Sequence, residues 1–356
     1  MYVGDDREGA MVSTTTTDGT GRRPSEPLAD LRAAVPDAVA ALLLTGAIFA
    51  FLHHRVRTGV SATLEVMPYL ADANAYWMYW LCQAFGWSAL LWAWMTTMLG
   101  LVRSARPPRW LPVPPARIER WHRATSLTTI GLMFAHAFLF FTELVRTREP
   151  GGGWVGRTWN AFVEAFVPGG YSSGTGRVAI LLGLLAFYLA IPLSIAFYLR
   201  HRTGGRTWRA LHRFVIVVYV LSAWHTLLYG TNVWFDGWPR TTLWLLQIPV
   251  AVLLLVRLLA PARRSERLRR LAGWLAVGRR AVALLAVSAS ILVVLAVVVT
   301  GRDGGRTPGV DGAGLSVHPW MVWLGTAVLL VAMVVAVAVV RAAERRRVAE
   351  RGGPRS

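Results

Sequence analysis

The most constraining feature of this sequence is a series of long, nearly uncharged apolar runs separated by short segments rich in arginine. About 20 apolar residues in an α-helix cross the hydrocarbon core of a bilayer, and such a helix satisfies its own backbone hydrogen bonds internally. Only 16% of the 356 residues are charged, whereas a soluble domain carries about a quarter. The sequence therefore predicts an all-α integral membrane protein.

Eight apolar runs are expected to be membrane-spanning helices. They lie at about residues 36–52, 76–102, 121–144, 177–199, 208–229, 241–259, 281–300 and 320–340. The segment between the third and fourth runs contains the sequence WNAFVEAF, which is compatible with a short amphipathic helix on the membrane surface. Pro192 is expected to kink the fourth span.

We divide the chain into four segments. Residues 1–35 contain little that could be buried and are expected to be a disordered cytoplasmic tail. Residues 36–260 are expected to form a six-helix bundle, and residues 261–341 a basic cytoplasmic loop followed by two additional transmembrane helices. Residues 342–356 are expected to be a basic cytoplasmic tail.

The arginines predict the orientation of the chain in the cell membrane. They lie mostly in the loops after the second, fourth and sixth spans and in the C-terminal tail, and the chain has no lysine. An excess of basic residues marks the cytoplasmic side, so both termini are expected there. Because the net charge of +19 comes from these short loops, it indicates membrane topology, and nucleic acid is not an expected partner.

Two of the predicted spans each carry two histidines. His122 and His136 form an i,i+14 pair in the third span, and His212 and His225 form an i,i+13 pair in the fifth. At about 3.6 residues per turn, the i,i+14 spacing returns to nearly the same face of a helix. Both spans run outward in the predicted topology. His122 is therefore expected to face His212 near the cytoplasmic side, and His136 to face His225 nearer the outer leaflet.

Facing imidazoles from two helices of a bundle can take both axial positions of a haem iron. An ionisable side chain inside the membrane is a functional candidate by default. These histidines therefore predict two b-type haems, held by coordination alone because the sequence has no C-x-x-C-H motif. The alternatives are histidines hydrogen-bonded between helices, and a single haem with His122 and His212 as ordinary interfacial residues.

Two details of the histidine helices need further explanation. The i,i+13 spacing turns the second imidazole roughly 140° from the first on an ideal helix, so helix tilt, a π-bulge or rotated haem planes would have to absorb the difference. Arg123 and Arg213 directly follow the first histidine of each span. A guanidinium fork suits a haem propionate, but both residues are equally well explained as positive-inside arginines.

Two helices that each carry two histidines, with a His-Arg pair near the start of each (His122-Arg123 and His212-Arg213), resemble the ferric reductase-like transmembrane domain. That superfamily includes NADPH oxidases, ferric reductases and the haem-binding subunit of the periplasmic methionine sulfoxide reductase. The resemblance covers about residues 36–260 and implies electron transfer from a cytoplasmic haem to an outer one. The oxidases and ferric reductases continue into a flavin and nicotinamide module, whereas this chain continues into two apolar spans without a Gly-rich dinucleotide fingerprint.

The expected function is therefore transmembrane electron transfer by a di-haem protein, an oxidoreductase component without an FAD or NAD(P) site of its own. A separate cytoplasmic flavoprotein or membrane quinol would donate electrons, and ferric iron, oxygen or a partner protein would accept them outside. The alternative is a haem-free transporter or assembly factor that uses the intramembrane histidines for metal or protons. A membrane metalloenzyme is disfavoured, because the i,i+13 and i,i+14 spacings place the imidazoles on one helix too far apart for one ion.

Overall fold

The computed structural model describes residues 26–105, 113–147, 153–172, 176–234, 237–259 and 317–352, together with single helical residues between 274 and 292. In this part of the chain the regular elements are helices. The long ones are α1 (Glu26–Arg57), α3 (Trp77–Ser104), α4 (Pro115–Thr147), α6 (Gly176–Tyr198) and α13 (Pro319–Gly352). The shorter ones are α2 (Thr63–Val66), η1 (Pro68–Ala71), α5 (Gly153–Phe166), α7 (Arg200–Thr203), α8 (Gly205–His212), α9 (Val215–Tyr229), η2 (Thr231–Val233), α10 (Trp238–Leu245) and α11 (Gln247–Leu259).

The predicted class, an all-α integral membrane protein, is confirmed. Within the described ranges, seven helical segments are long and apolar enough to cross a membrane, with α8 and α9 forming one segment and α10 and α11 another. These seven correspond to the first six predicted spans and the last one. The predicted seventh span, residues 281–300, lies outside the described residues except for a few single positions.

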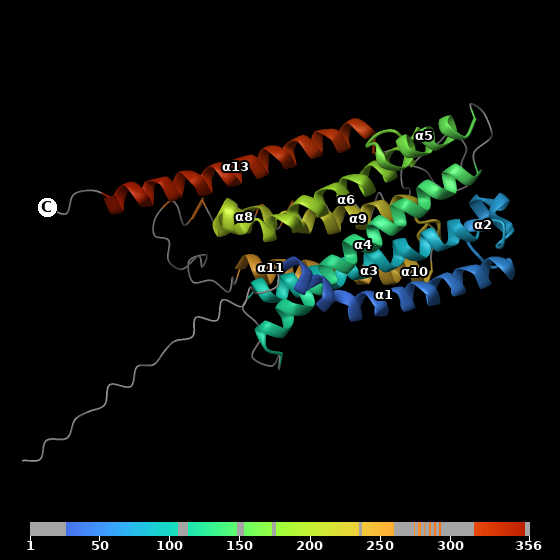
Figure 1. Ribbon diagram of the computed structural model, residues 1–356, viewed down its shortest axis with the longest axis horizontal. Coiled ribbons are helices and arrows are strands. Elements are labelled where there is room, and N and C mark those ends of the chain that lie inside the picture. The colour runs from blue at the N-terminus through green and yellow to red at the C-terminus, as the bar shows by residue number, and fades with distance from the viewer. Residues whose placement is uncertain are drawn as a thin grey trace, which may run out of the picture.

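The bundle is built around two helix pairs. α3 packs along α4, and α6 packs along α9, while α3 also contacts α9 and α11 and so joins the two pairs. Figure 1 shows α1 on one side of the bundle, against α3 and α4, and α13 on the opposite side, near α6 and α8. The two histidine-bearing segments, α4 and α8–α9, are therefore held inside the bundle.

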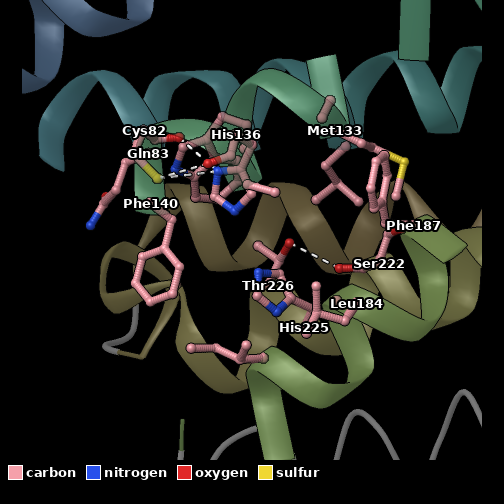
Figure 2. A pocket seen from close by; sticks show the side chains of 18 of the residues that line it. Cys82, Gln83, Met133, His136, Phe140, Leu184, Phe187, Ser222, His225 and Thr226 are labelled. Atoms are coloured by element: carbon pink, nitrogen blue, oxygen red, sulfur yellow. Dashed lines mark hydrogen bonds between the residues drawn. The ribbon is translucent and has the colours of Figure 1, made fainter. Parts of the chain in front are cut away.

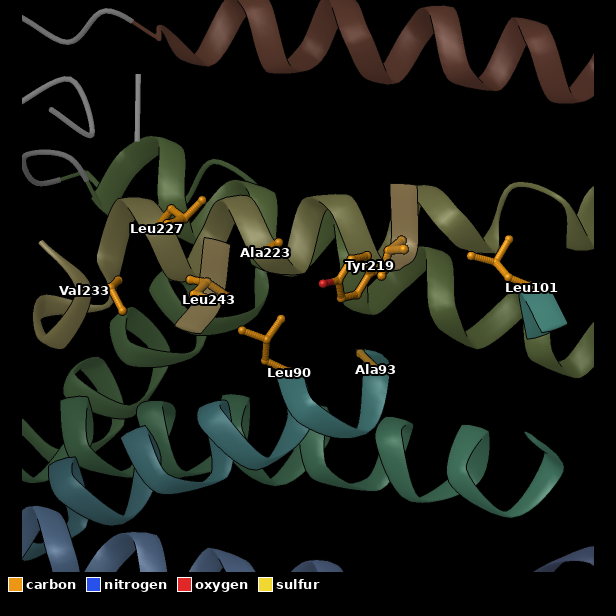
Figure 3. Packing of buried hydrophobic residues seen from close by; sticks show 9 residues of the cluster. Leu90, Ala93, Leu101, Tyr219, Ala223, Leu227, Val233 and Leu243 are labelled. Carbon is orange, nitrogen blue, oxygen red and sulfur yellow. The ribbon is translucent and has the colours of Figure 1, made fainter. Parts of the chain in front are cut away.

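A buried apolar cluster fixes α3 against α9 and the helices that follow it (Figure 3). Leu90 and Ala93 of α3 lie in the same cluster as Tyr219 and Ala223 of α9. Tyr219 is buried, and its hydroxyl donates a hydrogen bond to Oε1 of Gln247, 3.0 Å away. The remaining members of the cluster come from α3, α9, η2, α10 and α11: Leu101, Leu227, Val233, Leu243 and Val250.

The sixth predicted span is two helices with a break at Leu246. Pro249 explains the break, because proline has no N–H to donate to the carbonyl four residues earlier and its ring collides with that carbonyl. The Leu246 carbonyl accepts a hydrogen bond from the indole of Trp94, at 2.8 Å. A side chain of α3 thus bonds the backbone at the interruption.

The helices at both ends of the chain extend into the segments assigned to the terminal tails. α1 begins at Glu26, so residues 26–35 are helical, because Ala34 is buried and Asp30 accepts a hydrogen bond from the Tyr198 hydroxyl at 3.1 Å. At the other end α13 continues to Gly352, and Glu344 forms an ion pair with Arg206 at 3.6 Å. Both terminal helices therefore continue beyond their apolar segments, and the added turns contact other helices.

The helix expected in the segment before the fourth span is confirmed as α5, which contains the WNAFVEAF sequence. Ala161 and Ala165 are buried, whereas Trp154 and Trp159 are exposed. Its small residues thus face the bundle and its tryptophans face outward, as an amphipathic helix requires. α6 remains helical through Pro192, without an interruption.

The contact between α1 and α3 depends on small residues. The Thr45 hydroxyl donates a hydrogen bond to the Ala41 carbonyl at 2.8 Å and accepts one from the Ser88 hydroxyl at 2.7 Å, and all three side chains are almost fully buried. Small side chains let membrane helices approach closely, and hydroxyl groups then bond across the interface.

Substitutions of Ser88 test this contact. Ser88→Ala should lower the free energy of unfolding by about 0.6 kcal/mol through the lost interhelical hydrogen bond. Ser88→Leu should lower it by about 1–3 kcal/mol because the larger side chain overpacks the interface. Gly46→Ala is the control, since a methyl group there meets open space. The measurement is unfolding in detergent micelles, and a Ser88→Leu protein as stable as wild type would contradict the packing described.

Candidate functional site

The four histidines singled out in the sequence meet as two pairs inside the bundle. The ring centroids of His122 and His212 are 5.9 Å apart, with the ring planes at 84°. Those of His136 and His225 are also 5.9 Å apart, at 75°. In each pair one ring comes from α4 and the other from α8 or α9. The structure thus brings together the same partners that the topology argument paired.

The i,i+13 spacing of His212 and His225 is accommodated by a break in the helix. α8 ends at His212 and α9 begins at Val215. Between them, the N–H of Phe214 donates to the Leu211 carbonyl at 3.0 Å, and the N–H of Val217 donates to the Phe214 carbonyl at 2.9 Å. These i→i−3 bonds wind the backbone more tightly than an α-helix. The local change is therefore the opposite of the π-bulge considered for this position.

Three of the four imidazoles are hydrogen-bonded to main-chain carbonyls of a neighbouring helix. The Nδ1 atoms lie 3.0 Å from O of Thr96 for His122, 2.8 Å from O of Cys82 for His136, and 2.6 Å from O of Ala179 for His225. A carbonyl oxygen can only accept a hydrogen bond, so each Nδ1 carries the proton. In the neutral ring Nε2 then has a free lone pair, which is the form required to bind a metal.

A glycine lies against each of these three rings, four residues after the carbonyl that the ring bonds. A Cβ built at Gly86 would lie 3.0 Å from Cε1 of His136, and one at Gly100 would lie 3.1 Å from Cε1 of His122. At Gly183 it would lie 2.8 Å from Nδ1 of His225. The glycines therefore provide the space in which the imidazoles reach the backbone.

These glycines were missed in the sequence, although a signal was present. Gly86 and Gly100 form an i,i+14 pair, the same spacing as His122 and His136 on the helix that packs against them. Two neighbouring helices with equal spacings of glycine and histidine indicate a repeated contact. The carbonyl acceptors leave no such pattern, because every residue has a carbonyl group.

A cavity of about 140 Å³ surrounds the His136–His225 pair (Figure 2). Both imidazoles line it, from opposite helices, and its remaining wall is mostly apolar and aromatic, including Met133, Phe140 and Phe187. Cys82, whose carbonyl bonds His136, also has its Sγ 3.4 Å from Nδ1 of the same ring. The walls around this pair are therefore mainly apolar, with a few polar side chains such as Gln83, Ser222 and Thr226.

The His122–His212 pair has a different environment. His122 is buried, and Nδ1 of His212 is buried without a hydrogen-bond partner in the described part of the protein. The His212 ring instead stacks on Trp208, with centroids 5.2 Å apart and planes at 27°.

The two arginines of the predicted site differ in their surroundings. Arg123 donates to Oε1 of Glu119 at 2.6 Å and forms an ion pair with Asp30 at 3.5 Å. Its guanidinium also lies 4.7 Å from the ring centroid of Phe197. Arg213 is exposed at the turn between α8 and α9. The Glu119–Arg123 pair follows from the i,i+4 spacing, whereas the contribution of Asp30 from α1 had no signal in the sequence.

Further histidine and carboxylate side chains lie away from the two pairs. His53, at the end of α1, lies 3.1 Å from Oδ1 of Asn74 through its Nε2. Glu143 bonds Arg146 through both carboxylate oxygens, at 3.0 and 2.8 Å. Within the described ranges, no group of three or more His, Cys, Asp or Glu side chains could hold a bare metal ion.

Comparison with known proteins identifies the core of this chain. Residues 85–223 match the family model described as the ferric reductase like transmembrane component. This stretch includes His122, His136 and His212 and ends two residues before His225. No curated protein and no solved structure gives a match. The chain is a multi-pass membrane protein, and its residues 85–223 are similar to the ferric reductase-like transmembrane component.

Proposed function

We propose that this protein transfers electrons across the cell membrane through two b-type haems. His122 and His212 would be the axial ligands of one haem, and His136 and His225 those of the other. The observation that carries this proposal is the presence of two facing imidazole pairs, each 5.9 Å between centroids, in the core of a bundle related to ferric reductases.

The spacing of the rings fits two ligands on one iron. A metal–imidazole bond of about 2 Å on either side of a single metal puts facing ring centroids about 6 Å apart. Two histidines bonded to each other would instead need a donor Nε2, but both rings of the His136–His225 pair carry their proton on Nδ1. A ligating histidine almost always donates its other N–H to a carbonyl, carboxylate or water. Facing Nε2 atoms that carry no proton therefore suit the two ligands of a haem iron better than a hydrogen bond between the rings.

The residues around the pairs suit one-electron transfer. Bound haem would supply the change in iron oxidation state, and the chain would fix the imidazoles, exclude water and set the separation of the two sites. His122 and His136 lie on one continuous helix, and their i,i+14 spacing separates them by roughly 21 Å along its axis at about 1.5 Å per residue. The two sites thus lie at different depths in the membrane.

Electrons would enter from the cytoplasmic side, from a separate flavoprotein or from membrane quinol, and leave to ferric iron or a partner protein outside. The orientation, with both termini cytoplasmic, rests on the arginine distribution. Arg213, at the edge of the proposed inner site, would pair with a propionate. Arg123 would contribute to the same site while shared with Glu119 and Asp30.

Alanine variants of the ligands test the haem assignment. His122→Ala and His136→Ala should each lose one of two b-type haems per chain, because one axial ligand is removed from each site. Reduced-minus-oxidised spectra with haem counted per chain give the result. His53→Ala, at the end of α1, is the control and should keep both. A colourless wild-type protein, produced with adequate haem, would favour the haem-free transporter instead, and loss only in His136→Ala would indicate a single haem.

The glycine at the outer pair gives a second test that leaves every histidine in place. Gly183→Ala should lower haem affinity at the His136–His225 site by about 10–100-fold, as expected when a group that orients a ligand is disturbed. The added methyl group displaces His225 from the Ala179 carbonyl. Gly131→Ala is the matched control, since it lies on the histidine helix α4 with open space around it. Equal haem titrations for the two variants would contradict the proposed role of Gly183.

Transfer across the membrane is tested in vesicles that contain a trapped, impermeant oxidant and receive an impermeant reductant outside. The wild-type protein should speed reduction of the trapped oxidant, because electrons would pass between two sites at different depths in the membrane. His136→Ala should abolish this acceleration while its remaining haem is still reduced from one side. Equal rates in vesicles with and without wild-type protein would exclude transmembrane transfer.

A further inference from the structure

Three histidines of the proposed haem sites share one kind of support, which we name the carbonyl–glycine seat. It consists of a main-chain carbonyl that bonds Nδ1 and a glycine four residues later. In an α-helix the residue four positions on lies next to that carbonyl, so any side chain there would cover it. The three seats are Cys82 with Gly86 for His136, Thr96 with Gly100 for His122, and Ala179 with Gly183 for His225.

The fourth seat is missing. On α3 the two glycines have the i,i+14 spacing, and the same step from Gly183 along α6 reaches Phe197. The Phe197 ring packs against Trp208 with centroids 5.5 Å apart, and Trp208 stacks on His212. An aromatic column of Phe197, Trp208 and His212 therefore stands where the other three imidazoles have a carbonyl and a glycine.

This difference affects how firmly His212 would be held. A hydrogen bond from Nδ1 fixes the orientation and tautomer of a ligating imidazole and raises its basicity. His212 lacks this bond, since its buried Nδ1 has no partner among the described residues. It also ends the short helix α8 and is followed by the break at Arg213 and Phe214. Stacking on Trp208 restrains the ring plane but provides no acceptor for the N–H.

We propose that His212 is the exchangeable axial ligand of the inner haem, so that the reduced inner site admits a small neutral ligand such as carbon monoxide while the outer site does not. The inference rests on the proposed function. The exchange breaks the bond from iron to Nε2 of His212 and forms one to the incoming ligand, with no change in oxidation state. Trp208 is the positioning residue that opposes this exchange.

The test is a carbon monoxide titration of the purified full-length protein, reduced with dithionite under anaerobic conditions. Carbon monoxide should convert one of the two haems per chain, seen as a shift of half of the Soret absorbance. The double variant His136→Ala/His225→Ala keeps only the inner site and should convert completely. The double variant His122→Ala/His212→Ala keeps only the outer site and should retain its bis-imidazole spectrum. Conversion of both haems, of neither, or of the outer haem alone would overturn the inference.

A second measurement does not depend on removing any ligand. Trp208→Leu should raise the affinity of the inner site for carbon monoxide by about tenfold or more, the usual size of such supporting effects. Trp208→Phe keeps a ring that can stack on His212 and should stay close to wild type. Unchanged affinity in Trp208→Leu would exclude the proposed role of Trp208.

The outcomes separate this inference from the proposed function. A wild-type protein without haem, or a haem content unaffected by both double variants, would refute the haem assignment itself. Two haems that are lost separately in the two double variants, but react equally with carbon monoxide, would leave the proposed function in place and refute only the exchange at His212.

Discussion

The interaction on which this structure depends is the hydrogen bond from an imidazole of one helix to a main-chain carbonyl of its neighbour. Inside a membrane a polar ring without a partner is costly, and here His122 and His136 of α4 bond carbonyls of α3, while His225 of α9 bonds a carbonyl of α6. These bonds join the helices within the two packed pairs α3–α4 and α6–α9. These bonds use Nδ1 of the three histidines, so that Nε2 of each ring keeps a free lone pair.

The close approach that these bonds need explains the composition of the supporting helices. α3 and α6 present glycine where a ring lies against them, and α1 packs on α3 through Ala41 and Thr45. Large aromatic residues lie near the rings, as Phe140 and Phe187 do at the His136–His225 pair. Small residues therefore lie at the helix contacts, and large ones form the apolar surroundings of the histidines.

The two histidine pairs are not equivalent, and the difference begins in α6. Where α3 repeats its glycine, α6 has Phe197, which contacts Trp208 and the guanidinium groups of Arg123 and Arg200. The His122–His212 pair is thus surrounded by aromatic and charged groups that continue to Glu119 and Asp30. The His136–His225 pair has mainly apolar surroundings, and both of its imidazoles bond main-chain carbonyls.

The sequence by itself determined the fold class, the approximate positions of the seven described spans, and the histidines that meet, because apolar length and helical periodicity are local properties. It also contained the equal spacing of Gly86–Gly100 and His122–His136. Only the tertiary structure decided which carbonyl each ring bonds, how a break after His212 accommodates the i,i+13 spacing, and that Asp30 reaches Arg123. Those features depend on contacts between helices that are distant in the chain. Every residue has a carbonyl group, so the residue types do not indicate which carbonyl accepts a bond. They likewise do not indicate the helix break that the i,i+13 spacing needs.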